Sequence, residues 1–395
     1  LKGAPPEIAD QVARDVRSAS QTVIVRDQWA ITGLKLGIPT KLWFIDDIFN
    51  KMTFNYNYAQ EFSRTQIVQN RFDWRWQLRV DYAVTLPAKF DVMPVKFLDG
   101  VPVLNVYKDM KINFLPSNIA LGTDMQRQRI TEQSRFLEFP SPIVRTFLAQ
   151  NTGSFTWRLV ENGFLSPVID YKVQSQSTLV PLELDADGRQ RQGGEIFGQM
   201  FGGGGSLFNF GDVNQLQQTV TISMRPRLPD IFGINKFIET TGSYNVNYQW
   251  FDPLQPDPEL RDIVKTARYN SSLRLSPVFR WRQFGNSIFG TPKKGPQPDQ
   301  SLLSDIADVV QEVFFGFENL TMLFNQQNTA TNNGVMGGTG FSNVWGRTMT
   351  LRGDGEFWGP STAYQLGLVR NPHGSIRIVP SSSFPFFGFE STVGL

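Results

Sequence analysis

The stretch FDWRWQLRVDYAV, residues 72–84, alternates apolar and polar side chains without a break. A side-chain period of two places the two sets on opposite faces of one β-strand. One face carries Trp74, Trp76, Leu78, Val80 and Tyr82, and the other carries Asp73, Arg75, Gln77, Arg79 and Asp81. The stretch therefore predicts a long amphipathic strand, whose role depends on the medium that each face meets.

Similar alternation recurs along the chain. The stretches TFNYNYAQ (53–60) and SYNVNYQW (243–250) set aromatic side chains against small polar ones. In the second stretch Val246 and Tyr248 share the apolar face, whereas Asn245, Asn247 and Gln249 share the polar face. Further strands are predicted at 22–36, 119–127, 154–160, 168–175, 219–225, 267–275, 320–324, 347–352, 363–369 and 375–379. The sequence thus predicts an all-β, antiparallel fold of roughly a dozen strands with a few short helices.

The composition excludes several classes of protein. Charged residues make up only 19% of the chain, below the roughly 25% that is usual in soluble domains. Lys and Arg number 38 against 36 for Asp and Glu, so no net charge favours a nucleic-acid partner. There is no cysteine, which excludes disulfides and thiolate sites. No apolar run approaches the roughly 20 residues of a membrane-spanning helix, so any crossing of a bilayer would use strands.

Helical signals are few. Residues 1–20 are predicted to form a short helix and a linker, and residues 21–395 a β-barrel segment. That segment contains a long loop at 185–213 and a second helix at 301–315. The second helix has a wide apolar stripe and is expected to pack across a barrel mouth or a sheet end. Its acidic polar face makes a membrane-surface helix the alternative rather than the first choice.

Candidate chemistry is sparse. The single histidine, His373, lies in the turn sequence NPHGS and has no assignable catalytic partner. The adjacent acids Asp46 and Asp47 have no positioned partner for acid–base work. The glycines at 202–205 lack the following Lys and Ser or Thr of a phosphate-binding loop. We therefore predict no catalytic residues and no cofactor.

One acidic loop resembles a calcium site in part. Glu183, Asp185, Asp187 and Gly188 match positions 1, 3, 5 and 6 of a calcium-binding loop. Position 12, which should be a bidentate Glu, is Gly194, and no helices are predicted on either side. We predict a turn here and no metal site.

The amphipathic strands allow two interpretations. In a soluble sheet the apolar face would meet a packed core, as in an extracellular β-sandwich or adhesin. In a membrane barrel it would meet lipid, and Trp and Tyr near strand ends would form the aromatic girdles. The second interpretation predicts a lumen lined by Asp73, Arg75, Gln77, Arg79, Asp81, Asn245, Asn247 and Gln249. It predicts that Trp74, Trp76, Leu78, Val80, Tyr82, Val246 and Tyr248 face lipid.

Several stretches together resemble the SprA/Sov family, the outer-membrane translocon of the type IX secretion system in Bacteroidota. They are MTFNYNYAQEFSR with the following strand and FLDG (52–100), KINFLPSNIALGTDMQRQ (111–128), LPDIFGINKFIETTGSYNVNYQW (228–250) with ARYNSSLRLSP, and FENLTMLFNQQNTATNNGVMGG (317–338). These motifs are structural, and their order and spacing carry the resemblance. The family's chains are several times longer, so this chain would form one arc of a larger transmembrane barrel wall.

The resemblance also implies a function and partners. It implies a protein-conducting channel in the bacterial outer membrane that exports folded proteins and is linked to gliding motility. Outer-membrane lipid, secreted protein substrates, a PorV-like shuttle, plug proteins and the remaining barrel sequence would be its partners. An adhesin-like structural protein and a porin or receptor for small solutes are the alternatives.

Overall fold

A computed structural model gives the fold of this chain. It describes residues 5–35, 37–39, 49–86, 91–97, 104–137, 139, 141–185, 187–200, 210–229, 233–253, 260, 263–289, 309, 313–335, 359–372, 375–379 and 388–392. The helix predicted at 301–315 lies largely outside these residues, although Val309 and residues 313–315 are helical. The strand predicted at 347–352 and the residues His373, Asp46 and Asp47 also lie outside them.

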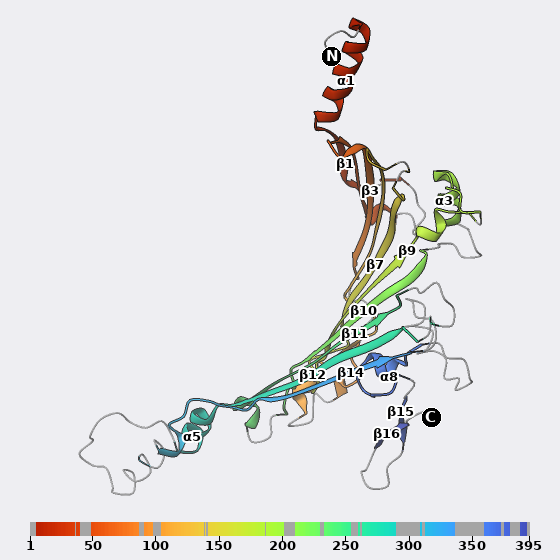
Figure 1. Cartoon of the computed structure of the whole chain (residues 1–395). Helices are drawn as coiled ribbons and strands as arrows, with labels where there is room; N and C mark the ends of the chain where they lie inside the picture. The colour runs from red at the N-terminus through yellow and green to blue at the C-terminus, as the bar shows by residue number, and fades with distance from the viewer. Residues whose placement is uncertain are drawn as a thin grey trace. The chain divides into compact units, whose positions relative to one another are not determined.

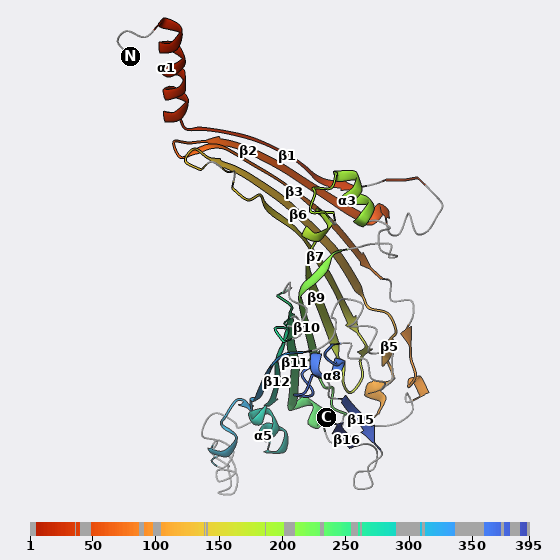
Figure 2. The same ribbon diagram turned by 45° about the vertical axis from the view of Figure 1, so that its right-hand side comes forward.

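One large sheet dominates the described chain (Figures 1 and 2). Its eleven strands are β1 (Val23–Lys35), β2 (Met52–Arg64), β3 (Val68–Thr85), β6 (Asn118–Ser134), β7 (Val144–Arg158), β9 (Val168–Thr178), β10 (Asp212–Met224), β11 (Ile238–Phe251), β12 (Thr266–Phe279), β13 (Leu320–Thr321) and β14 (Phe324–Asn333). Neighbours in this order pair with one another, except that β14 pairs with β12. The prediction of a mostly antiparallel, all-β fold is confirmed.

Two small sheets and several short helices complete the described chain. One sheet joins β4 (Asp91–Val92), β5 (Lys111–Asn113) and β8 (Val160–Glu161), and the other joins β15 (Ser375–Val379) and β16 (Gly388–Thr392). The α-helices are α1 (Pro6–Ser20), α3 (Gly193–Met200), α5 (Trp281–Phe289) and α8 (Thr362–Gln365), and the 3-10 turns are Phe49–Lys51, Asn105–Tyr107, Val180–Leu182 and Ile234–Lys236. Among the described residues, no helix combines the length and the apolar character needed to cross a membrane.

The chain divides into two compact units. Unit 1 comprises Leu1–Val84, Ala120–Gly153 and Gln174–Leu216, and unit 2 comprises Thr85–Ile119, Ser154–Val173 and Gln217–Leu395. The core of unit 1 gathers residues of β6, β7 and α3 together with Leu179, which directly follows β9: Met125, Phe147, Ala149, Leu179, Ile196 and Met200. The largest buried side chains of unit 2 include Tyr248, Tyr364 and Val246.

Strand register fixes which side chains share a face in unit 1. Trp29 of β1 pairs with Tyr58 of β2, which pairs with Trp76 of β3, so these three rings form one row across three strands. On the opposite face, Ala59 of β2 pairs with both Gln28 and Arg75. The alternation in the sequence is therefore converted directly into one aromatic face and one polar face.

Strand β1 lies at one end of the strand order. Within the described part of the chain, its outer edge pairs with no further strand along its 13 residues. One register shift interrupts its pairing with β2 between Ile31 and Leu34, where Gly33 adopts a positive φ of 70°. An edge of this length would ordinarily be covered, shortened or charged.

One predicted strand is wrong. Residues 363–369 contain the end of α8 and a turn rather than a strand. Ser361 caps this helix, since its side chain accepts a hydrogen bond from the Tyr364 N–H at 3.2 Å. Gly367, with a φ of 68°, then reverses the chain. The alternation of apolar residues in this segment reflects a short helix that buries Tyr364, not a pleated strand.

Candidate functional site

The described polar face of unit 1 carries a dense set of paired polar groups. Gln77 donates to Asp124 at 2.7 Å, and Gln128 donates to Asp73 at 3.0 Å. These two bonds tie β3 to β6 on the face predicted to line a lumen. Each joins a neutral amide to a carboxylate, so both acids have a hydrogen-bond donor from a neutral side chain.

Ion pairs balance most of the remaining charge on this face. Arg26 lies 2.6 Å from Glu61, Arg71 lies 3.3 Å from Glu132, and Arg79 lies 2.8 Å from Asp81. Arg79 also donates a hydrogen bond to Asp81, which makes this interaction stronger than a purely coulombic contact. The pairs Arg26–Glu61 and Arg79–Asp81 are solvent-exposed, so each contributes little to stability, whereas Arg71–Glu132 is partly buried. Their main effect is that the face presents both signs of charge in close alternation.

A shallow cavity of about 420 Å³ lies on the polar face of unit 1. Amide side chains dominate its wall: Gln28, Asn57, Gln77, Gln126 and Gln128. Ala59 lies between Gln28 and Arg75 at the bottom of the cavity, and its small side chain leaves space between these two longer ones. The wall is rich in hydrogen-bonding groups, and its apolar members are Ala59 and the aromatic side chains Tyr58 and Trp76.

The polar face of unit 2 repeats the arrangement with neutral partners. Asn245 donates to Thr221 at 2.8 Å, and Asn247 donates to Thr219 at 3.3 Å. Gln249 accepts a hydrogen bond from the Arg268 Nε at 2.7 Å. The structure therefore places the eight predicted lumen residues on polar faces within their own units.

The aromatic face of unit 1 is covered by protein over β6 and β7. Trp76 packs edge-on against Phe147, with ring centroids 5.8 Å apart, and Ile196 and Met200 of α3 lie buried in the same cluster. This cover consists of the 3-10 turn, the following loop and α3, residues 179–200, and we call it the loop cover. Trp76 is therefore in contact with a protein core on this side.

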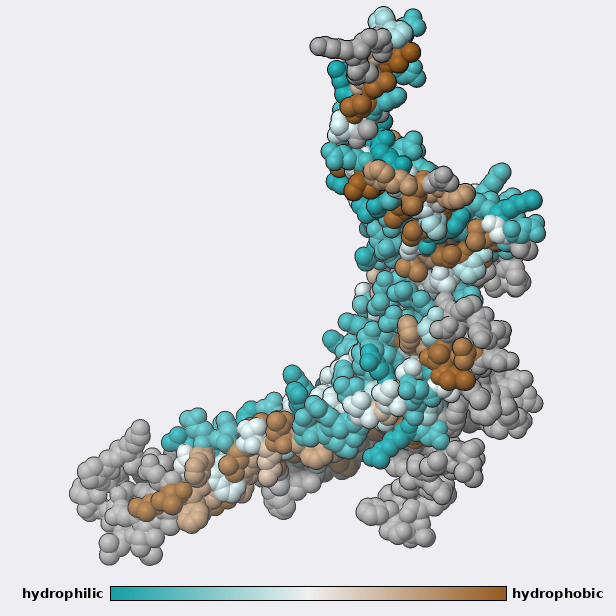
Figure 3. Space-filling view, viewed as in Figure 1, coloured by the Kyte–Doolittle hydropathy of each residue, from teal (hydrophilic) through white to brown (hydrophobic). Residues whose placement is uncertain are grey.

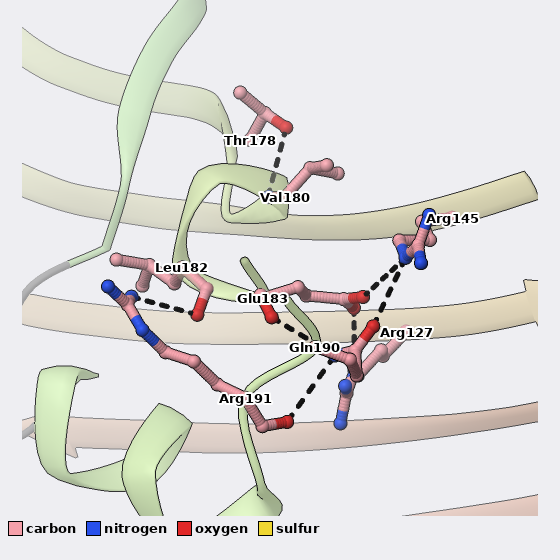
Figure 4. A network of polar contacts seen from close by, with 8 residues as sticks. All are labelled: Arg127, Arg145, Thr178, Val180, Leu182, Glu183, Gln190 and Arg191. Carbon is pink, nitrogen blue, oxygen red and sulfur yellow. Dashed lines mark hydrogen bonds and ion pairs between the residues drawn. The ribbon is translucent and has the colours of Figure 1, made fainter. Parts of the chain in front are cut away.

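A buried acid holds the loop cover to the sheet (Figure 4). The side chain of Glu183 is 0% exposed, and its Oε1 accepts a hydrogen bond from the Arg127 Nε at 2.7 Å. Its Oε2 lies 3.8 Å from the Arg145 Nε. Arg127 also stacks over Trp74 and Phe147, at 5.1 and 5.5 Å from the ring centroids. The acid is thus compensated by two arginines, as a buried carboxylate requires.

Further hydrogen bonds from side chains complete the attachment of the loop cover. Gln190 donates to the Glu183 carbonyl at 3.1 Å and accepts from Arg145 at the same distance, and Arg191 donates to the Leu182 carbonyl at 3.2 Å. Asp185 accepts from the N–H groups of Asp187 and Arg189 and so forms a tight turn. The predicted turn at 183–188 is confirmed. Glu183, which the calcium pattern had singled out, serves as the anchor of the cover.

The aromatic face of unit 2 has its own cover, made by residues 359–372 around α8. Tyr364 donates to the Ala267 carbonyl at 3.0 Å and accepts from Asn332 at 2.8 Å. Its ring meets Tyr248 and Tyr269 edge-on, with centroids 6.2 and 5.0 Å apart. Gln365 accepts from Gln218 at 2.9 Å. We call this segment the helix cover.

The helix cover corrects part of the prediction of lipid contact. Val246 is 1% exposed and Tyr248 is 0% exposed, so protein rather than lipid surrounds these two side chains. No local sequence pattern predicts this burial, because nothing in β11 shows that a segment more than a hundred residues later packs on it. Lipid contact at Trp74, Leu78, Val80 and Tyr82 stays a prediction. Trp76 instead packs against Phe147 of the protein core.

Part of the aromatic face in unit 1 is bare. Large apolar side chains of β1, β2 and β3 that share this face are exposed: Val25, Trp29, Ile31, Leu34, Phe62 and Phe72. Trp29 contacts the rings of Tyr56 and Tyr58, at 5.2 and 5.5 Å between centroids. We call these six residues the bare face. Exposed apolar side chains this close together mark a surface that meets lipid or a partner.

No family model matches the chain, and no curated protein is similar to it at a significant level. Within the described residues, no cluster of His, Cys, Asp or Glu is arranged to hold a metal ion. The candidate site therefore consists of the two faces of the sheet. The polar face is charge-balanced, and the aromatic face is partly covered by protein.

Proposed function

We propose that this chain is a wall segment of a large outer-membrane β-barrel that conducts proteins, as the resemblance to the SprA/Sov family implies. The polar face would line a water-filled passage, and the bare face would meet lipid. A pore wide enough for a folded protein needs many strands, because barrel diameter grows with strand number. The free edge of β1 offers a place for the neighbouring strand of such a wall.

The observation that carries this proposal is the charge balance of the polar face. A passage for diverse proteins should hold neither acidic nor basic cargo tightly. Paired charges and amide groups, such as Arg79 with Asp81 and Gln77 with Asp124, leave little net field to retain either kind. Strong hydrogen-bonding capacity would keep the face wet, because seven of the eleven residues that line the described cavity carry amide or guanidinium groups.

A second candidate is an extracellular β-sandwich or adhesin-like module. The observation in its favour is the loop cover, because a buried Glu183 with Arg127 and Arg145 is an arrangement found in protein cores. In this case the bare face would meet a second sheet rather than lipid. The two candidates make opposite predictions for one experiment.

The experiment uses single cysteines, because the chain has none of its own. Cysteines replace Gln77 on the polar face and Ile31 on the bare face, and each variant is reconstituted into lipid vesicles. A membrane-impermeant thiol reagent should label Gln77→Cys rapidly and Ile31→Cys slowly, while lipid-borne quenchers should reach a fluorophore only at position 31. A chain that stays dissolved without detergent, with both positions labelled rapidly, contradicts the wall and favours the adhesin-like module.

A further inference from the structure

A cluster of aromatic rings lies at the end of β12 in unit 2. The ring of Trp281 stacks on Phe315, with centroids 5.0 Å apart, and Phe284 lies 5.5 Å from Phe237 and 5.4 Å from Phe279. The indole N–H of Trp281 donates to the Phe314 carbonyl. Helix α5 is thereby fixed against residues 313–315, and its tryptophan has no unpaired donor.

The outer side of this cluster is unusually apolar and exposed. The side chains concerned are Ile288, Val313, Phe314, Phe317, Leu320, Met322, Leu323 and Phe324, and we call them the end patch. Met322 is 71% exposed, the highest value among them. Hydrophobic side chains gather around α5 and the adjoining strand ends in Figure 3. A soluble monomer rarely exposes so many large apolar side chains together.

Backbone contacts hold the chain around β13 beside the end of β12. Strand β13 pairs with Val278 and Phe279 of β12, and the Met322 N–H donates to the Pro277 carbonyl at 3.0 Å. Trp281, Phe284 and Ile288 are spaced as one face of α5, whereas Arg282, Gln283 and Ser287 are exposed. The helix is therefore amphipathic, with its apolar side continuous with the end patch.

The charged groups around the end patch carry both signs. Arg280 lies 3.2 Å from Glu239, and Arg282 lies 3.9 Å from Glu318. This rim has no net charge among these four groups, which suits a zwitterionic lipid headgroup better than an acidic or basic protein partner. An apolar face with Trp and Phe opposite a polar face is the pattern of a helix that lies in the membrane interface.

We propose that the end patch is a membrane-interface anchor. Helix α5 would lie parallel to the bilayer surface at the boundary between headgroups and acyl chains, with Met322, Leu323 and Phe317 in the apolar layer. Nine residues of helix are far too few to cross a bilayer, so the anchor lies on the membrane and does not span it. The proposal rests on the proposed function only in placing the chain at a membrane, and it does not need the strands to cross.

The test measures depth in the bilayer at single positions of the full chain. Met322→Cys carries an environment-sensitive fluorophore, and the chain is reconstituted into phosphatidylcholine vesicles with nitroxide quenchers placed either near the headgroup or deep in the acyl chain. The matched control is Ser287→Cys on the polar side of α5, and Phe317→Cys repeats the measurement with a second member of the end patch. All three positions are unique because the chain has no cysteine.

The expected result is quenching of the 322 and 317 labels by the shallow nitroxide about threefold more than of the 287 label. Raising the salt concentration should change this by less than about twofold, because the rim charges are already paired. Labels at 322 and 317 that water-soluble iodide quenches fully would overturn the anchor. So would labels reached by neither quencher, because they would then be covered by protein.

A label at Ile31→Cys separates this proposal from the wall. Lipid quenching at position 322 without lipid quenching at position 31 supports the membrane-interface anchor and contradicts the barrel-wall function. Lipid quenching at 31 without quenching at 322 removes the anchor and keeps the wall.

Discussion

The aromatic face of unit 1 exists in two conditions. Over β6 and β7 it is covered by the loop cover, and Trp76 of β3 packs against the same cluster, whereas over β1 and β2 and at Phe72 of β3 it is bare. The two regions have similar apolar side chains, but only the covered one has a buried acid with two arginines. The difference shows that an aromatic strand face does not by itself determine whether protein or another medium covers it. In the covered region, the buried ion pairs of Glu183 hold the covering segment in place.

The largest expected effect is in the covered region. Glu183→Ala should lower the free energy of unfolding by about 3 kcal/mol or more, because it leaves Arg127 and Arg145 without their buried partner. The matched control is Glu61→Ala, which removes an exposed partner of Arg26 and should cost less than about 1 kcal/mol. Hydrogen exchange of residues 179–200 measures the release of the cover. Equal costs for the two variants would show that the loop cover is not held by Glu183.

The next effect concerns the medium beside the strands. Val80→Arg should cost roughly 2 to 4 kcal/mol if this side chain faces lipid near the membrane midplane, whereas Gln77→Arg on the polar face should cost little. Folding titrations in lipid vesicles give both values. The reverse order of costs would show that the polar face meets lipid and the aromatic face meets water. No cost at either position would show that neither face meets lipid.

The helix cover of unit 2 allows a test of close packing. Gly367→Ala should cost about 2 kcal/mol, since its φ of 68° is unfavourable for alanine and the new Cβ would lie 2.9 Å from the Ser271 Cβ. Gly188→Ala has the same kind of strain, with a φ of 75°, but no atom within 4 Å, and should cost only about 1 kcal/mol. Thermal or denaturant unfolding measures the difference. Equal costs would mean that the helix cover is not seated on β12.

The smallest expected effect concerns one hydroxyl group. Tyr364→Phe removes the bonds to Ala267 and Asn332 and should cost about 1 kcal/mol. Burial raises the pKa of Tyr364 above its ordinary value of 10.0. Its contribution is therefore complete below pH 10 and is lost as the pH rises through the folded-state value. The Phe variant should lose part of this alkaline dependence, and an unchanged pH profile of stability would contradict the role of the hydroxyl.

The strands were largely predictable because alternation is a local property. Residues 53–60 and 72–84 lie inside β2 and β3, and their two faces follow from the period of two. The covers were not predictable, because Glu183 meets Arg127 and Tyr364 meets Ala267 only through long-range packing. Residues 363–369 were mistaken for a strand for the same reason: a short helix that buries one ring can imitate alternation.

The edge of β1 bears on how such a chain could fold. Among the described residues, the outer edge of the 13-residue strand β1 has no pairing strand, and beside exposed Val25, Trp29 and Ile31 it forms a template for any extended chain that arrives first. The correct neighbour must therefore arrive before an incorrect one, or a chaperone must occupy the edge until it does. Timing of assembly, rather than stability of the finished sheet, would then decide how much functional protein a cell obtains.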